Sequence, residues 1–292
     1  MVAVHSGFPA QSTQSVIKDA GKASRLPSLP DALRMAGYST AFYYGGDLDF
    51  ANMRAYLISM GFNRFISQDD FPRSLRTTKW GIHDEHLFER LLSDLDTTTA
   101  PFFKTFFTLS SHEPFEIPVE PAFPGVGEEN MFLSSIHYTD SCLGTFLERA
   151  RQRPWYANTL FILVSDHGHR MPGNNAYYEE DRFRIPMLWL GDALDSIGVV
   201  ESYGSQTDVA ATLLAQLSIE HSQFTFSRDL LASYSPPFAY YAFNDGFGFV
   251  APGQKLIWDH VGEMPIVDKA DSIHRANAFG YFQYYHRYFL AL

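Results

Sequence analysis

Cysteine is almost absent from this 292-residue sequence, because Cys142 is the only one. A single cysteine cannot form a disulfide within the chain. Cys142 falls in an amphipathic helical pattern, which predicts a small buried apolar side chain and not a reactive thiol. Bacterial periplasmic and surface domains can lack disulfides, so the cysteine content leaves the cellular compartment open.

Positive charge is also scarce. The chain has 22 Lys plus Arg against 33 Asp plus Glu, a net charge of -11, and its basic residues form no run. A polyanionic nucleic acid is therefore excluded as an expected partner. The same charge would be repelled by anionic lipid headgroups, so any contact with such a membrane would have to be local.

Long apolar runs are missing as well. No stretch approaches the roughly 20 apolar residues that span a bilayer. The first residues, "MVAVHSGFPAQ", contain neither the basic region nor the apolar core of a signal peptide. We therefore expect any information for export or membrane anchoring to lie outside this chain. Hydrophobic residues still make up 46% of the sequence, which is enough for a large globular core.

What the sequence does contain is an alternation of helical and strand-like patterns. The expected elements, in chain order, are a helix and a strand within 28–46, a helix within 50–61, a helix at 84–96, a strand at 102–109, a helix at 130–151, strands at 159–164 and 185–191, and a helix at 207–217. This order predicts an α/β fold with a mainly parallel sheet sandwiched by helices. In the helix at 130–151 the expected apolar stripe consists of Leu133, Ile136, Leu143, Phe146 and Leu147.

The pattern of residue types changes beyond Pro236. The segment "FAYYAFNDGFGFVAPGQKLIWD" alternates aromatic residues with glycine turns, which is typical of a small antiparallel meander. The aromatic end, "AFGYFQYYHRYFLAL", is expected to form a helix. We therefore predict one large domain at 1–235 and a small C-terminal subdomain at 236–292.

In the stretch "FILVSDHGHRMPG", an expected apolar strand is followed by Asp166 and His167. Carboxylate oxygen and imidazole nitrogen are both ligands for zinc or manganese. An isolated Asp-His pair is more simply a capping aspartate beside a solvated histidine, but ligand sites of parallel sheets lie beyond the carboxyl ends of the strands. His169, in the same tight loop, cannot easily reach the same ion and is expected at the rim of the site.

A second polar cluster, "SSHEP", follows the expected strand at 102–109. Its His112 could donate to a phosphate or sulfate oxygen or protonate a leaving group. The alternative is a loop histidine that only hydrogen-bonds to backbone. Because both clusters follow apolar strands, they are expected at the same edge of the sheet.

Two further segments offer polar groups. "YYGGDLDFANM" contains Asp47, Asp49 and Asn52; a helix cap explains one of them, and the neutral amide of Asn52 is the better candidate for contact with an anionic or hydroxylated ligand. "HDEH" places His83 and His86 around a helix start. A metal site there is possible in principle, but a solvated helix start is the simpler interpretation.

Together, "FILVSDHGH", "FTLSSHEPFEIP", "FYYGGDLDFANMRAYLISMGF" and "GFPAQSTQSVIKDAGKASRLPSLPDALRMAGY" resemble the lipoteichoic acid synthase-like branch of the sulfatase and alkaline phosphatase superfamily, over roughly residues 5 to 220. The resemblance implies a phosphoglycerol or phosphoethanolamine transferase of the bacterial envelope. In that branch a threonine takes the headgroup from a phospholipid donor and passes it to a glycan or glycolipid acceptor, with a divalent metal, manganese, magnesium or zinc, assisting.

By this resemblance, Asp166 and His167 are two of the metal ligands and His112 contacts the phosphoryl group or the departing oxygen. Asp47, Asn52 and His169 are assigned to the substrate. A catalytic domain of this branch lies on the extracytoplasmic side of the membrane, held there by N-terminal helices that this sequence does not contain.

The sequence departs from the family at its start. In the family the nucleophilic threonine and a further acidic ligand precede the segment that "HSGFPAQ" resembles, and here that segment begins at residue 5. We therefore expect a truncated chain that is inactive or nearly so and binds metal weakly, since Ser12 and Thr13 lie past the expected position. Two alternatives stay open: an envelope domain without catalysis that binds lipid or protein, and a sulfatase, whose formylglycine precursor would lie in the missing part.

Overall fold

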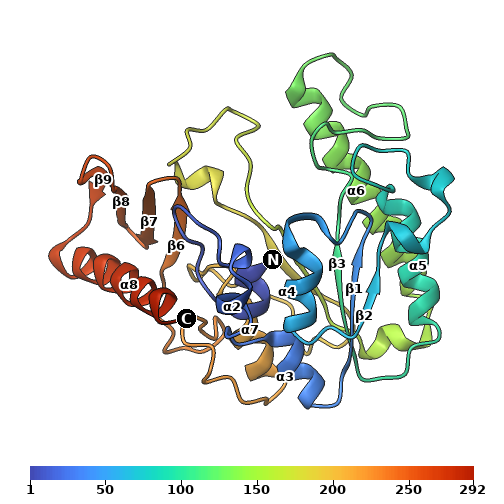
Figure 1. Ribbon diagram of the computed structural model, residues 1–292, viewed down its shortest axis with the longest axis horizontal. Helices are drawn as coiled ribbons and strands as arrows, with labels where there is room; N and C mark the ends of the chain where they lie inside the picture. Colours follow the sequence, from blue (N-terminus) through green and yellow to red (C-terminus); the bar gives the residue numbers. More distant parts are fainter.

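The computed structural model describes residues 1–292 and contains three separate sheets (Figure 1). The first is fully parallel, in the order β2-β1-β3, with β1 at Ser39–Tyr44, β2 at Arg64–Ile66 and β3 at Phe102–Phe107. Its middle strand, β1, is buried from Thr40 to Tyr44, as expected for a strand covered on both faces. The short strand β2 is the one element of this sheet that the sequence patterns did not indicate.

Helices cover both faces of the parallel sheet. On one side lie α5 (Asp84–Leu95) and α6 (Glu128–Ala150), and on the other lie α3 (Leu29–Met35) and α4 (Met53–Ser59), as Figure 1 shows. Because successive side chains of a strand point to opposite faces, Tyr43 packs toward α5 and α6 while Phe42 packs toward α4. The expected helix-covered α/β architecture is confirmed.

The second sheet consists of two strands. Strand β4 (Phe161–Val164) and strand β5 (Met187–Leu190) run antiparallel, with Phe161 opposite Leu190. The long loop between them holds no crossover helix, only the short turn Glu180–Arg182, and a chain that returns without a crossover pairs antiparallel. Helix α7 (Asp208–Gln216) follows.

The third sheet is a four-stranded antiparallel meander, as the glycine-punctuated aromatic pattern predicts. Its strands are β6 (Ala239–Phe243), β7 (Gly246–Ala251), β8 (Gln254–Asp259) and β9 (Met264–Lys269). Helix α8 (Ser272–Ala291) lies across one face, where Tyr285 joins the aromatic core of this sheet. The domain boundary at 235/236 stays a prediction, since Phe8 of the N-terminal region packs into the same core.

Short elements complete the chain. Helices α1 (Val2–Ser6) and α2 (Ala20–Ala23) lie near the amino terminus. The remaining single turns of 3-10 helix are Val16–Lys18, Phe50–Asn52, Gln68–Asp70, Arg73–Leu75 and Pro154–Asn158. No helix of the structure combines the length and the apolar character needed to cross a membrane.

The apolar stripe of α6 differs from the one that its sequence indicated. Ile136 is 42% exposed and does not belong to it, whereas Phe146 is buried as predicted and shares its face against α5 and the sheet with Tyr138 and Cys142. Because Tyr138 and Cys142 carry polar atoms, a count of aliphatic residues does not include them in the apolar stripe. Cys142 is buried as predicted, and burial raises the pKa of its thiol to about 11.

His5 of α1 is an ionisable group placed wholly inside the core. Its ring packs edge-on against Phe62 at 5.3 Å, its Nε2 lies 3.2 Å from the Thr105 hydroxyl of β3, and its Nδ1 has no partner. Burial, with a smaller effect of the nearby amino terminus, lowers the pKa of His5 to about 3. The folded protein therefore keeps this imidazole neutral.

We expect this burial to make stability fall on acidification. Between the ordinary histidine pKa of 6.5 and the folded value of about 3, the unfolded chain binds the proton that the folded chain refuses. The free energy of unfolding should thus drop by about 1.4 kcal/mol per pH unit in this window, roughly 2 kcal/mol between pH 7 and pH 5. Urea unfolding of wild type and His5→Phe at both pH values measures it. The same pH dependence in both proteins would contradict the assignment.

Candidate functional site

The polar clusters that follow β3 and β4 lie side by side. The His169 ring, after β4, stacks on Phe132 of α6 with centroids 4.2 Å apart and meets Phe115, after β3, edge-on at 6.3 Å. The charge of Glu113, also after β3, acts on the His169 imidazole. The two loops thus lie close together, as expected, although the strands that they follow, β3 and β4, belong to separate sheets and not to one.

Asp166 and His167 form a pair of facing acceptor atoms. The Asp166 carboxylate accepts the backbone N–H of His167 at 2.9 Å, and its other oxygen lies 3.5 Å from His167 Nε2. His167 Nδ1 lies 2.8 Å from the Gly168 carbonyl oxygen, which can only accept, so Nδ1 donates and, in the neutral form of the ring, Nε2 is an acceptor that faces the carboxylate. Two bare acceptors that face each other attract a proton or a metal cation.

This pair has the donor chemistry of a metal site but does not complete one. Two ligand atoms bound at about 2.0–2.2 Å to one tetrahedral ion lie roughly 3.3–3.6 Å apart, which the 3.5 Å separation matches. The backbone hydrogen bond from His167 Nδ1 is the kind that orients metal-binding histidines. However, the chain holds no cluster of three or more His, Cys, Asp or Glu side chains. The residues present thus account for two ligands.

The amino terminus reaches the same place. The Met1 amino group is buried, and burial lowers its pKa, while the negative charge of Asp166 acts in the opposite direction. Asp166 therefore lies within electrostatic reach of the start of α1. Of the hydroxyls weighed from the sequence, Ser12 lies elsewhere, because its carbonyl oxygen accepts the backbone N–H of Asp245 in the C-terminal sheet.

His169 is held by its surroundings. Its Nδ1 accepts the backbone N–H of Met171 at 3.1 Å, so the proton of the neutral ring sits on Nε2. Burial against Phe132, aided by the charges of Arg170 and His167, lowers the pKa of His169. The side chain is thus a neutral ring with one free donor, and its assignment to the substrate stays a prediction.

His112 is exposed and lies against an indole. Its Nδ1 donates to the Glu113 carbonyl oxygen at 2.9 Å, and its ring meets Trp80 edge-on at 5.0 Å. The same Glu113 carbonyl oxygen accepts the indole N–H of Trp80 at 2.5 Å. The hydrogen bond to backbone expected of a loop histidine is therefore present at Nδ1 of His112, and Nε2 makes no hydrogen bond within the protein.

A polar cavity of about 290 Å³ opens beside this indole, beyond the end of β1. Asp47 contributes a carboxylate, Arg76 and Lys79 contribute cations, and Trp80 contributes an aromatic wall that Phe50 extends at a centroid distance of 5.8 Å. Arg76 is neutralised in part by Asp69 at 2.9 Å, whereas the Lys79 ammonium lies over the Trp80 ring at 4.9 Å. Sequence reasoning found Asp47 but missed these cations and aromatic rings, which no spacing pattern connects.

Asn52 lies next to this region in an unusual backbone conformation. It has φ 61° and follows Ala51 at φ 53°, so two successive residues with side chains take up the left-handed region. Asn52 precedes α4 but makes no capping hydrogen bond with its side chain. Such conformations cost of order 1–3 kcal/mol each and gather at functional sites, so the predicted substrate contact at Asn52 is retained as a proposal.

The "HDEH" segment has a structural role at its centre. Asp84 is buried and accepts the backbone N–H groups of Leu109 and Ser110 at 2.8 and 3.1 Å, together with the Thr139 hydroxyl. Burial raises the pKa of Asp84, against the lowering effect of these donors. The prediction of a solvated helix start is wrong for His83, which is 4% exposed. The hydrogen bonds from Leu109 and Ser110 to the Asp84 carboxylate hold the start of α5 against the loop that carries His112.

Gln206 fixes the turn that carries Asp166. Its side-chain amide donates to the carbonyl oxygens of Ser165 and Asp166, at 2.6 and 2.7 Å. Next to it, Ser205 exchanges hydrogen bonds with the backbone of Tyr240 in β6 and donates its own N–H to Asp208. The turn is thereby connected to α7 and to the C-terminal sheet.

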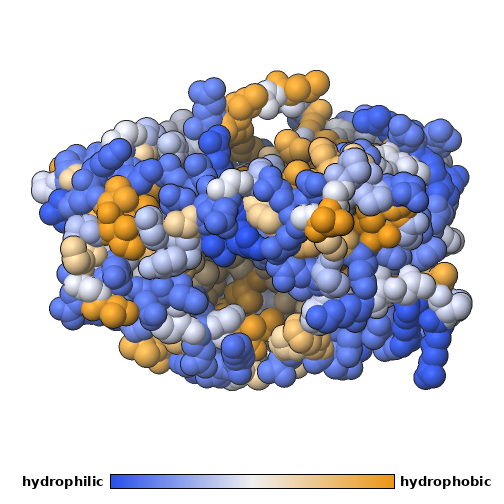
Figure 2. Space-filling view, turned by 90° about the horizontal axis from the view of Figure 1, so that it is seen from above, coloured by the Kyte–Doolittle hydropathy of each residue, from blue (hydrophilic) through white to orange (hydrophobic).

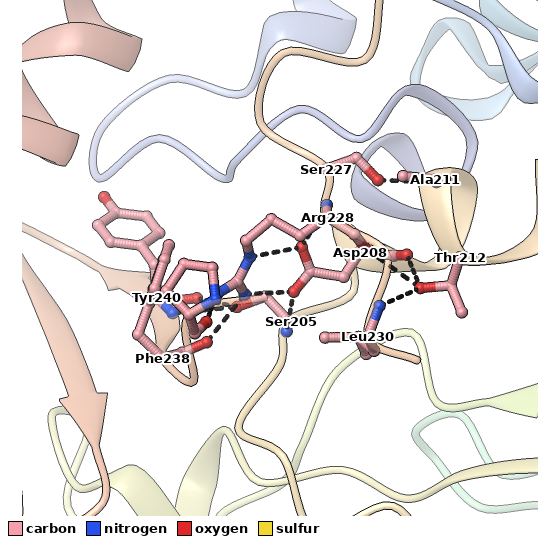
Figure 3. Close-up of polar contacts among 10 residues, drawn as sticks. Ser205, Asp208, Ala211, Thr212, Ser227, Arg228, Leu230, Phe238 and Tyr240 are labelled. Atoms are coloured by element: carbon pink, nitrogen blue, oxygen red, sulfur yellow. Dashed lines mark hydrogen bonds and ion pairs between the residues drawn. The ribbon is translucent and has the colours of Figure 1, made fainter. Parts of the chain in front are cut away.

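A buried ion pair anchors this network (Figure 3). Asp208, at the start of α7, is fully buried and binds the Arg228 guanidinium through both carboxylate oxygens. Arg228 also donates to the carbonyl oxygens of Pro236 and Phe238 and stacks on the Phe238 ring at 3.7 Å. All charge in this pair is therefore matched by partners.

We expect Arg228→Met to lower the free energy of unfolding by about 3–5 kcal/mol, because it leaves the Asp208 carboxylate buried without its cation. The matched control is Arg34→Met, which breaks the exposed Arg34–Asp31 pair and should cost about 0–1 kcal/mol. Denaturant unfolding of both variants measures the difference. Equal losses would show that the buried pair is not an anchor.

Comparison with known proteins places the chain in a family. The Sulfatase family profile matches residues 2–219. The lipoteichoic acid synthase-like protein YvgJ of Bacillus subtilis is 25% identical over 71% of this chain and 37% of its own length. Phosphoglycerol transferase I of Xanthomonas campestris is 29% identical over 72% of this chain and 32% of its own length. The chain thus covers about a third of the length of these curated relatives.

The fold agrees with this relationship. A solved structure of an alkaline phosphatase superfamily protein from Vibrio parahaemolyticus superposes with a TM-score of 0.82, at 24% identity, over 98% of this chain and 75% of that one. The two chains therefore share a fold. The chain belongs to the Sulfatase family, and its relatives include lipoteichoic acid synthase-like proteins and phosphoglycerol transferases.

Proposed function

We propose that this chain is the ligand-binding part of a metal-dependent phosphoglycerol- or phosphoethanolamine-type transferase of the bacterial envelope. The observation that carries the proposal is the pair of facing acceptor atoms on Asp166 and His167, 3.5 Å apart, in the loop after β4 that packs against the loop after β3. The similarity to phosphoglycerol transferase I supports the choice of headgroup.

The cavity suits a small anion that also carries hydroxyls. Lys79 and Arg76 supply positive charge for a phosphate, the Asp47 carboxylate can accept hydrogen bonds from glycerol hydroxyls, and the Trp80 ring covers the carbon chain. In this proposal His112 Nε2 meets the phosphoryl group or the departing oxygen. Asn52 and His169 complete the contacts, through an amide and an Nε2–H donor.

Asp166 and His167 would hold the divalent ion, manganese, magnesium or zinc, as enzymes of this superfamily generally depend on metal. Once bound, such an ion stabilises negative charge on a phosphoryl oxygen and lowers the pKa of an attacking hydroxyl. Two protein ligands bind weakly, because zinc sites usually have about three or four.

The hydroxyl that attacks the donor lipid is proposed to come from outside these 292 residues, so that the chain by itself transfers no headgroup. A phospholipid would be the donor, a glycan or glycolipid hydroxyl the acceptor, and the extracytoplasmic side of the membrane the location. The incomplete ligand set also favours a second candidate, an envelope domain that binds the same headgroup without turnover. The sulfatase alternative has no observation in its favour beyond the family itself.

Binding of glycerol phosphate tests the cavity. We expect Lys79→Met to weaken the affinity roughly tenfold, since it removes one charge-assisted contact worth about 1.5 kcal/mol. Isothermal titration calorimetry measures this, with glycerol as the uncharged ligand. Lys269→Met, at an exposed lysine of β9, is the matched control and should leave the affinity unchanged. Equal binding by both variants, or no preference for glycerol phosphate over glycerol, contradicts the proposed substrate.

Manganese binding tests the metal ligands. Asp166→Asn and His167→Ala should each reduce the already weak affinity at least tenfold, because each removes one of two donors. Electron paramagnetic resonance of free and bound Mn²⁺ reports the affinity, and Asp195→Asn, at an exposed carboxylate in another loop, is the control. If all three variants bind Mn²⁺ like the wild type, Asp166 and His167 are not metal ligands.

A further inference from the structure

The outer side of helix α8 carries apolar side chains that face solvent. On the inner side, Ala278 and Tyr285 are buried in the aromatic core of the C-terminal sheet. Away from this core, Ile273, Tyr284 and Leu290 are each more than half exposed. Because a helix with apolar side chains on all sides is normally buried on all sides, the outer side of α8 has the character of a surface that another layer covers.

The exposed side chains of α8 lie next to one another. Tyr284, Arg287 and Leu290 follow at intervals of three residues, and side chains three or four residues apart are neighbours on a helix surface. Ile273 lies on the same side, because the distance along the chain from Ile273 to Tyr284 amounts to about three helical turns. Arg287 is exposed and forms no ion pair. The outer side thus combines aromatic and aliphatic groups with an unpaired cation.

Helix α8 also differs in charge from the rest of the chain. Residues 272–292 contain no Asp or Glu, whereas the whole chain has 33 acidic residues and a net charge of -11. The other arginine of the helix, Arg275, is neutralised by Asp268 of β9, with the charged atoms 2.7 Å apart. The unbalanced arginine of α8 is therefore the one in its carboxyl half.

Helix α2 brings further cations to this end of α8 (Figure 1). The Lys22 ammonium donates to the carbonyl oxygen of Phe289 at 2.7 Å and lies 4.9 Å from the centroid of the Phe289 ring. Lys18 and Arg25, on either side of α2 in the chain, are exposed and form no ion pair. Asp19, which caps α2, is the single acid among residues 16–26. Positive charge thus prevails where α8 ends.

Exposed apolar residues elsewhere are accompanied by acids. Seen from above, the molecule is mostly hydrophilic, with apolar residues in small separate patches (Figure 2). Each aliphatic side chain that is more than three-quarters exposed has an Asp or Glu two residues away; these side chains are Val126, Ile197, Val199 and Val261. At the carboxyl half of α8 the exposed apolar side chains instead lie beside unpaired cations.

This combination fits an anionic lipid bilayer better than it fits a second protein. Tyrosine rings are enriched at the headgroup level of membranes, and Lys and Arg side chains are attracted to anionic headgroups. A helix of 20 residues on the outside of the protein can lie along the plane of a bilayer with one side among the headgroups. A second copy of this chain, docked across a two-fold axis, would instead bring the same cations face to face.

We propose that the outer side of α8 and the adjoining side chains of Lys18, Lys22 and Arg25, here called the α2–α8 surface, dock on an anionic lipid bilayer. Tyr284 and Leu290 enter the headgroup region, and the cations contact lipid phosphates. Because the same bilayer repels the net charge of the whole chain, the contact is local and sensitive to salt. This inference does not rest on the proposed ligand or metal, whose residues lie elsewhere.

Flotation of the full 292-residue chain with lipid vesicles tests the α2–α8 surface. The probes are vesicles of phosphatidylcholine and vesicles of phosphatidylcholine mixed with phosphatidylglycerol, each at low and at high salt. We expect saturable binding to the anionic vesicles at low salt, loss of this binding at high salt, and little binding to the neutral vesicles. Equal binding to both kinds of vesicle, or none to the anionic vesicles at low salt, overturns the proposal.

Two variants and two matched controls locate the contact. Arg287→Gln should weaken binding to anionic vesicles roughly fivefold, the equivalent of about 1 kcal/mol for one cation near an anionic surface. Leu290→Ser should weaken it at least as much, because it removes apolar area from the bilayer. Arg73→Gln changes an exposed arginine without an ion pair, and Val126→Ser changes an exposed aliphatic residue; both should bind like the wild type. All four side chains are exposed, so the free energy of unfolding should stay the same.

Equal losses of binding in the control variants would show that the α2–α8 surface is not the contact. A dimer in sedimentation velocity that Arg287→Gln dissociates, without vesicle binding by the wild type, would identify this surface as an interface between copies and would also overturn the proposal. None of these outcomes changes the expected binding of glycerol phosphate or Mn²⁺, so the two proposals can fail separately.

Discussion

The buried ion pair between Asp208 and Arg228 is the contact on which the connection between site and scaffold depends. Its carboxylate is satisfied by the guanidinium and by backbone N–H groups, and its guanidinium by two carbonyl oxygens and the face of Phe238. Through Ser205 and Gln206 the same network holds the turn at Asp166. A buried pair of this kind favours one arrangement of α7, the turn and the C-terminal sheet, because any other leaves a charge unmatched inside the protein.

The cations of the candidate site belong to a chain whose net charge is negative. A chain with a net charge of -11 repels an anionic ligand at long range, so binding relies on the local cations Lys79 and Arg76 and on any metal at Asp166 and His167. The hydrogen bonds of the three loop histidines decide what each can do. His112 and His167 donate through Nδ1 and keep Nε2 bare, whereas His169 accepts at Nδ1 and keeps an Nε2 donor.

The sequence by itself determined the helices and strands with strong periodicity, the meander after Pro236, and the positions of Asp166, His167 and His112 directly after strands, because period and strand ends are local properties. It predicted the strand at 185–191 but not its antiparallel pairing, and it did not indicate the burial of Tyr138 in α6 or the cavity of Lys79, Arg76 and Trp80. Those depend on which segments meet in space. Pairing direction, burial of mixed polar and apolar faces, and the tautomer of each histidine are decided by neighbours distant in the chain, so only the tertiary structure decided them.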